Sequence, residues 1–329
     1  MNALGKIKKF LVKVFLFIFF IVLFTWFLFQ NPQKIYTMPL LTIGPKSQAN
    51  FELVREFYKK QSPLRIEALK KITSLNFEIY KILVPEVHCP NLVRVGAVGD
   101  GGKWICNPWA LPKNNCSIYS LGLNNEISFD MEIQQFTEYM CKLYGYDMGQ
   151  QRLETMLKYK AINGKLHKVM ISNRTNASRS ESTIEDLFLS NGDTYAEILK
   201  MDVEGIELTQ LPIFLEKMKV CHILLEAHGS PLHMRRLISS IAAQGYLMYY
   251  FELNGNLASE FSFINQNCME SYGAATIDRF LDRTVVQVCN STNGFGPCQV
   301  DSDCSGKDLI CERSVSNDPV CCPYFWGPQ

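Results

Sequence analysis

The sequence predicts an α/β domain with a mostly parallel sheet and helices on both faces, preceded by one transmembrane helix and followed by a small disulfide-rich module. Short apolar runs alternate with polar, helix-prone stretches over residues 86–285. Such alternation is typical of a parallel sheet that is covered on both faces. A long apolar run lies near the amino terminus, and half of the twelve cysteines lie close to the carboxyl terminus.

The expected anchor is the apolar run of residues 10–29, which is interrupted by one charge, Lys13. Twenty residues at helical rise span about 30 Å, the thickness of a bilayer's hydrocarbon core. Lysines are concentrated on its amino-terminal side, so residues 1–9 are expected in the cytosol and the rest across the membrane, in a type II orientation. A cleaved signal peptide is the alternative. However, the run exceeds the usual ~7–15 residues, and no small-residue cleavage site follows it.

Residues 30–85 are expected to form a stem. Prolines keep its first part extended, and Pro63 splits the helix-prone remainder. Apolar residues recur at helical spacing from Leu64 to Leu83. The stem therefore either packs on the domain behind it or spaces that domain from the membrane, and no chemistry is expected in it.

The domain itself, residues 86–285, alternates strand and helix patterns. Strands are expected at 117–121, 142–146, 168–172, 196–201, 221–226 and 246–251. Helices are expected at 127–142, 183–189, 207–217 and 232–244. In such sheets ligands bind beyond the carboxyl ends of the strands, so the polar clusters that follow the strands form the candidate site.

The tail, residues 286–329, is rich in loop-forming residues and in cysteine. It contains Cys289, Cys298, Cys304, Cys311, Cys321 and Cys322. So small a segment cannot bury enough apolar surface to fold alone, which favours disulfides, in a pairing that the sequence does not choose. Zinc is the alternative, but adjacent cysteines suit it poorly, and no metal site is expected.

The composition agrees with an oxidising compartment. Twelve cysteines are more than a cytosolic protein usually carries. Glycosylation sequons begin at Asn115, Asn173, Asn176 and Asn290. The net charge is +1, and no block of like charges follows residue 34, which argues against a nucleic-acid-binding face. Nothing in the sequence indicates the oligomeric state.

Two polar motifs follow the first two expected strands. In the turn after the first strand, Gly122 would let the backbone approach a ligand, and the next helix offers free amides. Asp147 ends the next strand, where a carboxylate could accept the hydroxyls of a nucleoside ribose. An ordinary turn and an exposed loop aspartate are the alternatives. The glycine-containing segment at 100–105 precedes the sheet and is interpreted as a tight turn.

Two further motifs follow later strands. Asp202 and Glu204 alternate along an extended backbone, so they would point in one direction and could hold a substrate hydroxyl, a cofactor amine or a metal. Glu226 and His228 likewise share a face, and histidine is the natural base near neutral pH. A structural or solvent-facing histidine is the alternative.

Three segments together resemble the methyltransferase-like, FkbM-related proteins of animals. They are Gly-Asp-Gly-Gly-Lys-Trp-Ile-Cys at 99–106, Tyr-Ser-Leu-Gly-Leu-Asn-Asn-Glu-Ile-Ser-Phe at 119–129 and Glu-Ile-Leu-Lys-Met-Asp-Val-Glu-Gly-Ile-Glu at 197–207. The last contains the family's hallmark, Leu-Lys-x-Asp-x-Glu-Gly, which ends the fourth strand. The resemblance covers residues 88–265, so the cysteine-rich tail lies outside it.

The resemblance implies a class I methyltransferase (Rossmann-like) fold that binds S-adenosylmethionine. Carried over by position, Gly122 and Asn124 would lie along the methionine part and Asp147 would bind the ribose. Ser172 or Asn173, after the third strand, would lie near the adenine. The cofactor turn departs from the family in carrying Glu126 close to the expected position of the cofactor's carboxylate.

For the reaction, the resemblance implies that Asp202 and Glu204 face the sulfonium and the acceptor. Glu204, Glu226 and His228 are the candidate bases if the acceptor is a hydroxyl. We expect O-methylation of a lumenal acceptor, such as a glycan, by an enzyme anchored in the Golgi or endoplasmic reticulum membrane. The alternatives are a catalytically inactive protein with this fold and a non-enzymatic extracellular protein that binds a partner through the cysteine-rich module.

Overall fold

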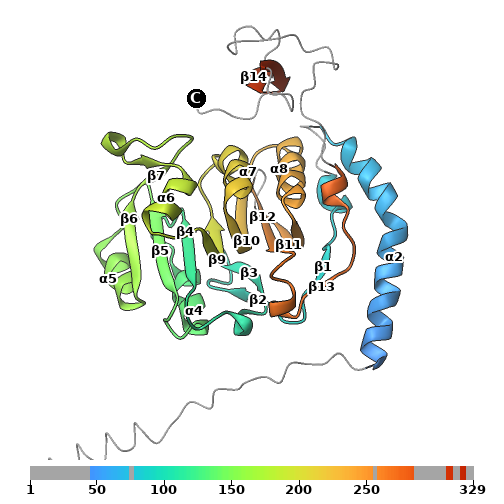
Figure 1. The fold of residues 1–329 in the computed structure, drawn as a ribbon, viewed down its shortest axis with the longest axis horizontal. Helices are drawn as coiled ribbons and strands as arrows, with labels where there is room; N and C mark the ends of the chain where they lie inside the picture. The colour runs from blue at the N-terminus through green and yellow to red at the C-terminus, as the bar shows by residue number, and fades with distance from the viewer. Residues whose placement is uncertain (1–44, 74–77, 255–257, 285–308, 314–318, 324–329) are drawn as a thin grey trace, which may run out of the picture. The chain divides into compact units, whose positions relative to one another are not determined.

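The computed structural model describes residues 45–73, 78–254, 258–284, 309–313 and 319–323 (Figure 1). The chain divides into two units, Met1–Lys46 and Ser47–Gln329. The expected anchor at 10–29 lies outside the described residues. Among the helices that are described, none is both long and apolar enough to span a membrane.

Seven strands form the central sheet, in the order β11-β12-β10-β9-β4-β5-β6 (Figure 1). They are β4 (Ser117–Leu121), β5 (Lys142–Asp147), β6 (Gly164–Lys168), β9 (Tyr195–Met201), β10 (Lys219–His228), β11 (Tyr246–Asn254) and β12 (Ala258–Asn265). The strands from β10 to β6 run parallel, whereas β12 is antiparallel to both of its neighbours. The predicted α/β class with a mostly parallel sheet is confirmed.

The strand order reverses direction at β4, which has β5 on one side and β9 on the other. The chain builds β5 and β6 outward on one side of β4 and then returns to build β9 and β10 on the other side. A reversal of this kind opens a crevice at the carboxyl ends of the strands, where ligands bind in doubly wound sheets.

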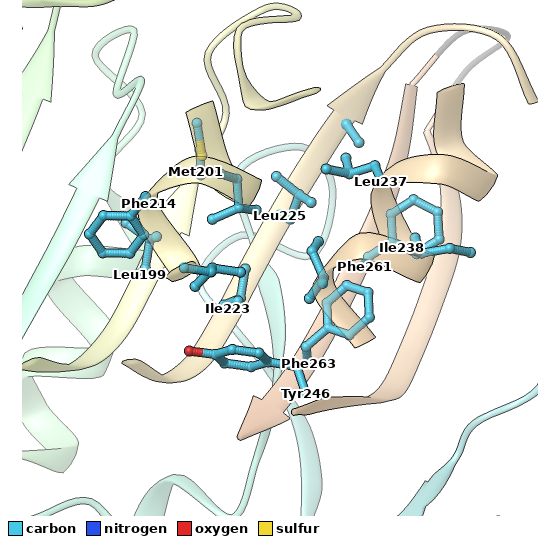
Figure 2. Packing of buried hydrophobic residues seen from close by; sticks show 14 of the residues in the cluster. Leu199, Met201, Phe214, Ile223, Leu225, Leu237, Ile238, Tyr246, Phe261 and Phe263 are labelled. Carbon is cyan, nitrogen blue, oxygen red and sulfur yellow. The ribbon is translucent and has the colours of Figure 1, made fainter. Parts of the chain in front are cut away.

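Helices cover both faces of the sheet. They are α4 (Ser128–Phe136), α5 (Leu153–Ala161), α6 (Ile184–Ser190), α7 (Glu207–Lys217) and α8 (Pro231–Ala243). Figure 2 shows Leu199, Ile223 and Leu225 of the sheet in a cluster with Phe214 of α7 and Leu237 of α8. The alternate strand residues belong to a second cluster, which includes residues of α4 and α5. Both faces of the central strands are therefore buried, as their nearly continuous apolar sequence requires.

The stem packs on the domain through its second half. Helix α2 (Pro45–Lys70) runs through Pro63, so the predicted split is wrong. Pro63 lacks the amide that would make a helical hydrogen bond. The preceding Ser62 makes two side-chain contacts here: its hydroxyl donates to the carbonyl of Tyr58 and also contacts Asp278. The core includes Leu69, Ile72, Ile79 and Leu83. Of the two alternatives for this segment, packing on the domain is the one observed.

Several predicted elements differ from the observed ones. The third strand of the sheet is β6, whereas β7 (Met170–Ile171) pairs with β8 (Glu181–Ser182) outside the central sheet. The helix expected to reach residue 142 ends at Phe136, because Glu138 and Tyr139 adopt positive φ angles. Helix α5 and strand β12 were not predicted. Strands β2 (Leu92–Val95) and β3 (Lys103–Cys106) form an antiparallel hairpin. The glycines of the segment at 100–105 lie in the connection between them, where a turn was expected.

Three disulfides cross-link the domain: Cys89–Cys106, Cys116–Cys141 and Cys221–Cys268. The expectation of disulfides is therefore confirmed for these six cysteines. In the tail, β14 (Leu309–Arg313) and β15 (Pro319–Pro323) form an antiparallel pair. The rest of the predicted cysteine-rich module lies outside the described residues.

Candidate active site

The turn after β4 packs directly on the end of β9. Gly122 has a φ of +78°, and a Cβ atom at this position would lie 1.6 Å from the carbonyl oxygen of Asp202. The amide of Asp202 donates to the carbonyl of Leu121. Only glycine fits here, because any side chain would collide with the backbone of β9's end. This contact brings two of the predicted motifs together.

Asp147, at the end of β5, holds this turn in place. Its Oδ2 accepts hydrogen bonds from the amides of Leu123 and Asn124, at 2.8 and 2.7 Å, and its Oδ1 accepts one from Gly149. Asn124 has a φ of +43°, a conformation that asparagine tolerates better than most residues. The predicted pair of Gly122 and Asp147 is thus a contiguous unit, although Asp147 was not expected to bind the turn itself.

Glu126 ends the cofactor turn and contacts the start of α4. Its Oε1 accepts a hydrogen bond from the amide of Ser128, at 2.7 Å, at the start of α4. Its side chain also packs beneath Gly101 of the β2–β3 turn, where a Cβ atom would lie 2.3 Å from its Cγ. The carboxylate that the sequence placed near the cofactor is therefore engaged in capping a helix.

The four predicted catalytic side chains meet at the ends of β9 and β10. Nε2 of His228 lies 3.6 Å from an Oε of Glu204 and 3.6 Å from an Oε of Glu226. Asp202, Glu204 and His228 each offer an atom within 4.8 Å of the others. The backbone at Glu204 has a φ of +59° and is not extended as predicted, yet the side chain still reaches the cluster.

The carboxylate nearest the ring of His228 was not predicted from the sequence. Glu207, the first residue of α7, is fully buried, and its Oε1 lies 3.2 Å from Nδ1 of His228 and 2.7 Å from its amide nitrogen. This hydrogen bond, aided by the charges of Glu207, Glu204 and Asp202, raises the pKa of His228 to about 9. A raised pKa keeps a proton on the imidazole at neutral pH, which makes His228 the least suitable of the three candidate bases.

The carboxylates of the cluster differ in proton affinity. Burial raises the pKa of Asp202 to about 6, and the charge of Glu226 contributes to this rise. The pKa of Glu226 is lowered, because a hydrogen bond from Glu260 and the charge of Lys103 outweigh its burial. Asp202 is thus ionised near neutral pH and is the carboxylate whose pKa best suits a general base.

Lys103 and Glu260 also belong to this site and were not predicted. Nζ of Lys103 lies 3.3 Å from an Oε of Glu226 and makes a closer ion pair with Glu260. The lysine stands in the glycine-rich motif that was singled out, and that motif was the signal available for it. Glu260 lies directly opposite Glu226 in the register of β10 and β12.

Asp202, Glu204 and His228 have the donor types and the spacing of a divalent-metal site. Glu207 contacts only Nδ1 of the His228 ring, as the carboxylate partner of a metal-ligating histidine does, and Nε2 faces Glu204 and Glu226. In the absence of an ion, the imidazolium of His228 offsets part of the negative charge of the surrounding carboxylates.

Ser172 and Asn173 do not follow the third strand of the sheet. They follow β7, where the amide of Ser172 donates to the carbonyl of Ser182. The side-chain oxygen of Asn173 accepts hydrogen bonds from Thr209 and Gln210 of α7. The prediction rested on a strand at 168–172, and the true edge strand ends at Lys168. The prediction that Ser172 or Asn173 lies near the adenine therefore loses its basis, which was their expected position after the third strand of the sheet.

The strand order, the glycine turn after β4 and the carboxylates after β5 and β9 define a class I methyltransferase fold. A methyltransferase domain family matches residues 50–271, more than half of the chain. The chain belongs to this family, and S-adenosylmethionine is its cofactor, as the sequence predicted. A comparison with curated proteins found no match.

Solved structures with similarity to the chain are also methyltransferases. Precorrin-6y C5,15-methyltransferase from Geobacter metallireducens GS-15 is 11% identical, with a TM-score of 0.32 over 48% of this chain and 84% of that one. TrmK of M. capricolum, in complex with S-adenosylhomocysteine, is 15% identical, with a TM-score of 0.30 over 49% of this chain and 66% of that one. Human methyltransferase-like protein 13, also in complex with S-adenosylhomocysteine, is 13% identical, with a TM-score of 0.31 over 56% of this chain and 90% of that one. These similarities are too low to carry a functional argument.

Proposed function

We propose that this chain transfers the methyl group of S-adenosylmethionine to an oxygen atom of a lumenal acceptor, such as a glycan. One observation carries the proposal: the backbone of Asp202 touches Gly122 while its side chain belongs to the cluster of Glu204, Glu226 and His228. A cofactor lying on the Gly122 turn would therefore present its methyl group to that cluster. The assignment to the FkbM-related proteins belongs to this proposal.

The cofactor turn has the properties that S-adenosylmethionine requires. Gly122 permits close approach of a ligand to the backbone, and the nearby Asn124 is exposed, although its backbone amide donates to Asp147. A carboxylate has about four acceptor positions, and Asp147 uses three of them for Leu123, Asn124 and Gly149. One position remains for a ribose hydroxyl. Asp147 would thus shape the turn and bind one hydroxyl without losing an existing bond.

The acceptor would meet Asp202 first. When bound, S-adenosylmethionine supplies a methyl group already activated by its sulfonium, so the protein's task is alignment and removal of one proton. Asp202 would take the proton that the acceptor oxygen gives up on receiving the methyl group. A pKa of about 6 leaves Asp202 ionised at neutral pH and still able to take that proton.

His228 would orient the acceptor rather than deprotonate it. Its Nδ1 is held by Glu207, so the proton on Nε2 faces Glu204 and Glu226 at 3.6 Å, beyond a direct hydrogen bond. An acceptor oxygen that enters the cluster can accept that proton. Glu204, whose side chain is 81% exposed, lies at the open side of the cluster and is placed to contact the acceptor.

The lumenal compartment is part of the proposal. The apolar run at 10–29, with lysines before it, supports a single-pass type II anchor in the Golgi or endoplasmic reticulum. Three disulfides in the described domain support an oxidising environment. Deleting residues 10–29 should release the protein from the membrane fraction, and its persistence there would contradict the anchor.

Calorimetry tests cofactor binding. Residues 47–329, which contain the domain with its stem helix, should bind S-adenosylmethionine, and Asp147→Ala should lose binding because the turn and the ribose contact are both weakened. Asp193→Ala is the matched control, since Asp193 lies before β9 at the opposite end of the strands and bonds Tyr119. No heat with the wild-type domain at millimolar cofactor would favour an inactive fold or a binding protein acting through the cysteine-rich module.

A further inference from the structure

We propose that the edge of the domain formed by α5 and β6 binds a polyanion, namely a polysaccharide that carries sulfate or carboxylate groups. This surface, the basic edge, consists of Lys160 of α5 with Lys165 and Lys168 of β6. Strand β6 ends the sheet on the side opposite β11, and α5 packs against it (Figure 1). The choice of a polysaccharide rests on the lumenal compartment of the proposed function, whereas the charge of the surface is independent of it.

The charge of this part of the chain is unbalanced. The whole chain contains 33 lysines and arginines and 32 acidic residues, yet residues 155–180 contain six lysines and arginines and no aspartate or glutamate. No two of these six are adjacent, so they form no block of like charges in the sequence. The fold gathers three of them on one surface, because α5 packs on the last strand of the sheet.

The lysines of the basic edge are available to a ligand. Lys160, Lys165 and Lys168 are all exposed. None of the three forms an ion pair within the part of the chain that the structure describes, whereas the nearby Lys158 pairs with Glu154. The positive charge of the basic edge is therefore not neutralised by neighbouring side chains of the domain.

Lys165 and Lys168 belong to opposite faces of the edge strand, because side chains alternate along a strand. On one face, Nζ of Lys165 lies 5.6 Å from the centroid of the Tyr144 ring, and this cation–π contact holds the ammonium group beside the sheet. On the other face, Lys168 is opposite Asp147 in register, but the carboxylate of Asp147 accepts three backbone amides. Both sides of the edge are thus positively charged.

Lysines on an edge strand also prevent pairing with another chain, and this is the alternative role. Two observations favour a ligand. Lys160 stands on α5, where there is no strand edge to protect. Charges of either sign protect an edge, whereas this segment carries one sign only, and a field of one sign attracts ligands of the other.

The compartment selects the class of polyanion. The three disulfides of the described domain are typical of an oxidising environment outside the cytosol. Anionic phospholipids are concentrated in the cytoplasmic leaflet, on the other side of the membrane. Polysaccharides with sulfate or carboxylate groups are the polyanions that remain. Since β5 and β4 separate β6 from β9, the basic edge would hold a stretch of polymer and not the reacting group.

Binding to immobilised heparin tests the proposal, with the full chain in a non-ionic detergent and no cofactor present. The wild-type chain should remain bound at about 0.15 M salt. The variant Lys160→Gln/Lys165→Gln/Lys168→Gln should bind at least about tenfold more weakly. The slope of log Kd against log salt concentration should also decrease by about two to three, because each contacting lysine releases about one counterion.

Lys59→Gln/Lys60→Gln/Lys71→Gln is the matched control, because it removes the same charge from exposed positions of the stem. The control should bind heparin as the wild type does. Elution of the wild type below about 0.15 M salt, or an equal loss of affinity in the control, would overturn the proposal. Displacement from heparin by phosphatidylserine in mixed micelles would overturn it in favour of lipid headgroups. Because no cofactor is used, failure of the proposed methyl transfer would leave this result unchanged.

Discussion

The carboxylate of Glu207 lies 3.2 Å from Nδ1 of His228, and it also accepts the amide of the same residue. Glu207 begins α7, directly after the loop that carries Asp202 and Glu204, whereas His228 ends β10. The pair therefore ties the ends of two neighbouring strands together. It also decides the charge of the histidine at the centre of the candidate site.

Replacing Glu207 by glutamine should lower the pKa of His228 from about 9 toward its usual range near 6.5. Glutamine keeps an oxygen that can accept the imidazole proton, but its NH2 group cannot accept the amide of Gly205, which now donates to the other oxygen of Glu207. NMR titration of residues 47–329 measures the change, with Glu185→Gln, which pairs with Lys217 elsewhere, as the control. A midpoint that stays near pH 9 would show that Glu204 and Asp202 hold the proton instead.

The same pair should make stability depend on pH. Because the pKa of His228 is higher in the folded state, its contribution is complete below about pH 6.5 and is lost as the pH rises through about 9. The contribution is at most about 3 kcal/mol, and solvent at the partly exposed ring reduces it. Urea unfolding between pH 6 and pH 9.5 should show this loss in the wild type, and a much smaller one in His228→Gln.

Gly122→Ala should abolish cofactor binding and reduce stability. Its Cβ would lie 1.6 Å from the carbonyl oxygen of Asp202, so the turn or the end of β9 must move. Gly192→Ala is the matched control, because Gly192 has a similar φ of +76° and no atom within 4 Å of the added Cβ. The control should lose only the ~1–2 kcal/mol of the left-handed backbone. Equal losses for both variants would show that the contact with Asp202 is unimportant.

Glu86→Ala should destabilise the domain by about 3 kcal/mol or more. The buried carboxylate of Glu86 accepts hydrogen bonds from the amides of Met248, Phe280 and Leu281, which would all lose their partner. Chemical unfolding measures the loss, and Glu154→Ala, at an exposed ion pair, should change stability very little. An effect of Glu86→Ala as small as that of the control would contradict this role.

Burial raises the pKa of Glu86 to about 7, so this residue also affects the pH dependence of stability. The folded state holds the proton where the unfolded chain has released it, and the stabilising effect of that proton is lost as the pH rises from about 4.5 through 7. Glu86→Ala should remove this part of the pH dependence.

Removal of metal ions should leave cofactor affinity unchanged. The residues spaced to hold an ion are Asp202, Glu204 and His228, whereas the turn expected to bind the cofactor is held by Asp147. Calorimetry with S-adenosylmethionine before and after dialysis against a chelator tests this. A loss of affinity that magnesium or manganese restores would identify the three residues as metal ligands.

The sequence predicted the central strands well because each is a buried apolar run that polar residues terminate. The edge strand β6 was missed because only Leu166 is apolar in it. Strand β12 was missed because Ser259, Glu260 and Ser262 make it look exposed, although Tyr80, Lys103 and the backbone of Trp104 pair with them in the interior. Burial by a distant polar partner leaves no local pattern in the sequence.

The candidate site could be predicted because its polar residues end neighbouring strands of the sheet. The carboxyl ends of neighbouring parallel strands meet at one edge of a sheet, so Asp202, Glu204, Glu226 and His228 were expected to converge, and they do. Their protonation could not be predicted. It depends partly on Glu207, which the sequence assigns to a helix without showing that its side chain faces His228. It also depends on Lys103, which is distant in the sequence and reaches the site only through tertiary packing.

The central claim is that Asp202, whose backbone packs on the cofactor turn, takes the proton of the acceptor. Transfer of a labelled methyl group from S-adenosylmethionine to lumenal extracts tests it. The wild-type chain should label an acceptor, with activity falling as the pH drops through about 6. Asp202→Asn should bind the cofactor, as measured by calorimetry, but should label the acceptor at least about a hundredfold more slowly. Labelling by Asp202→Asn at the wild-type rate, with the same pH profile, would contradict the account.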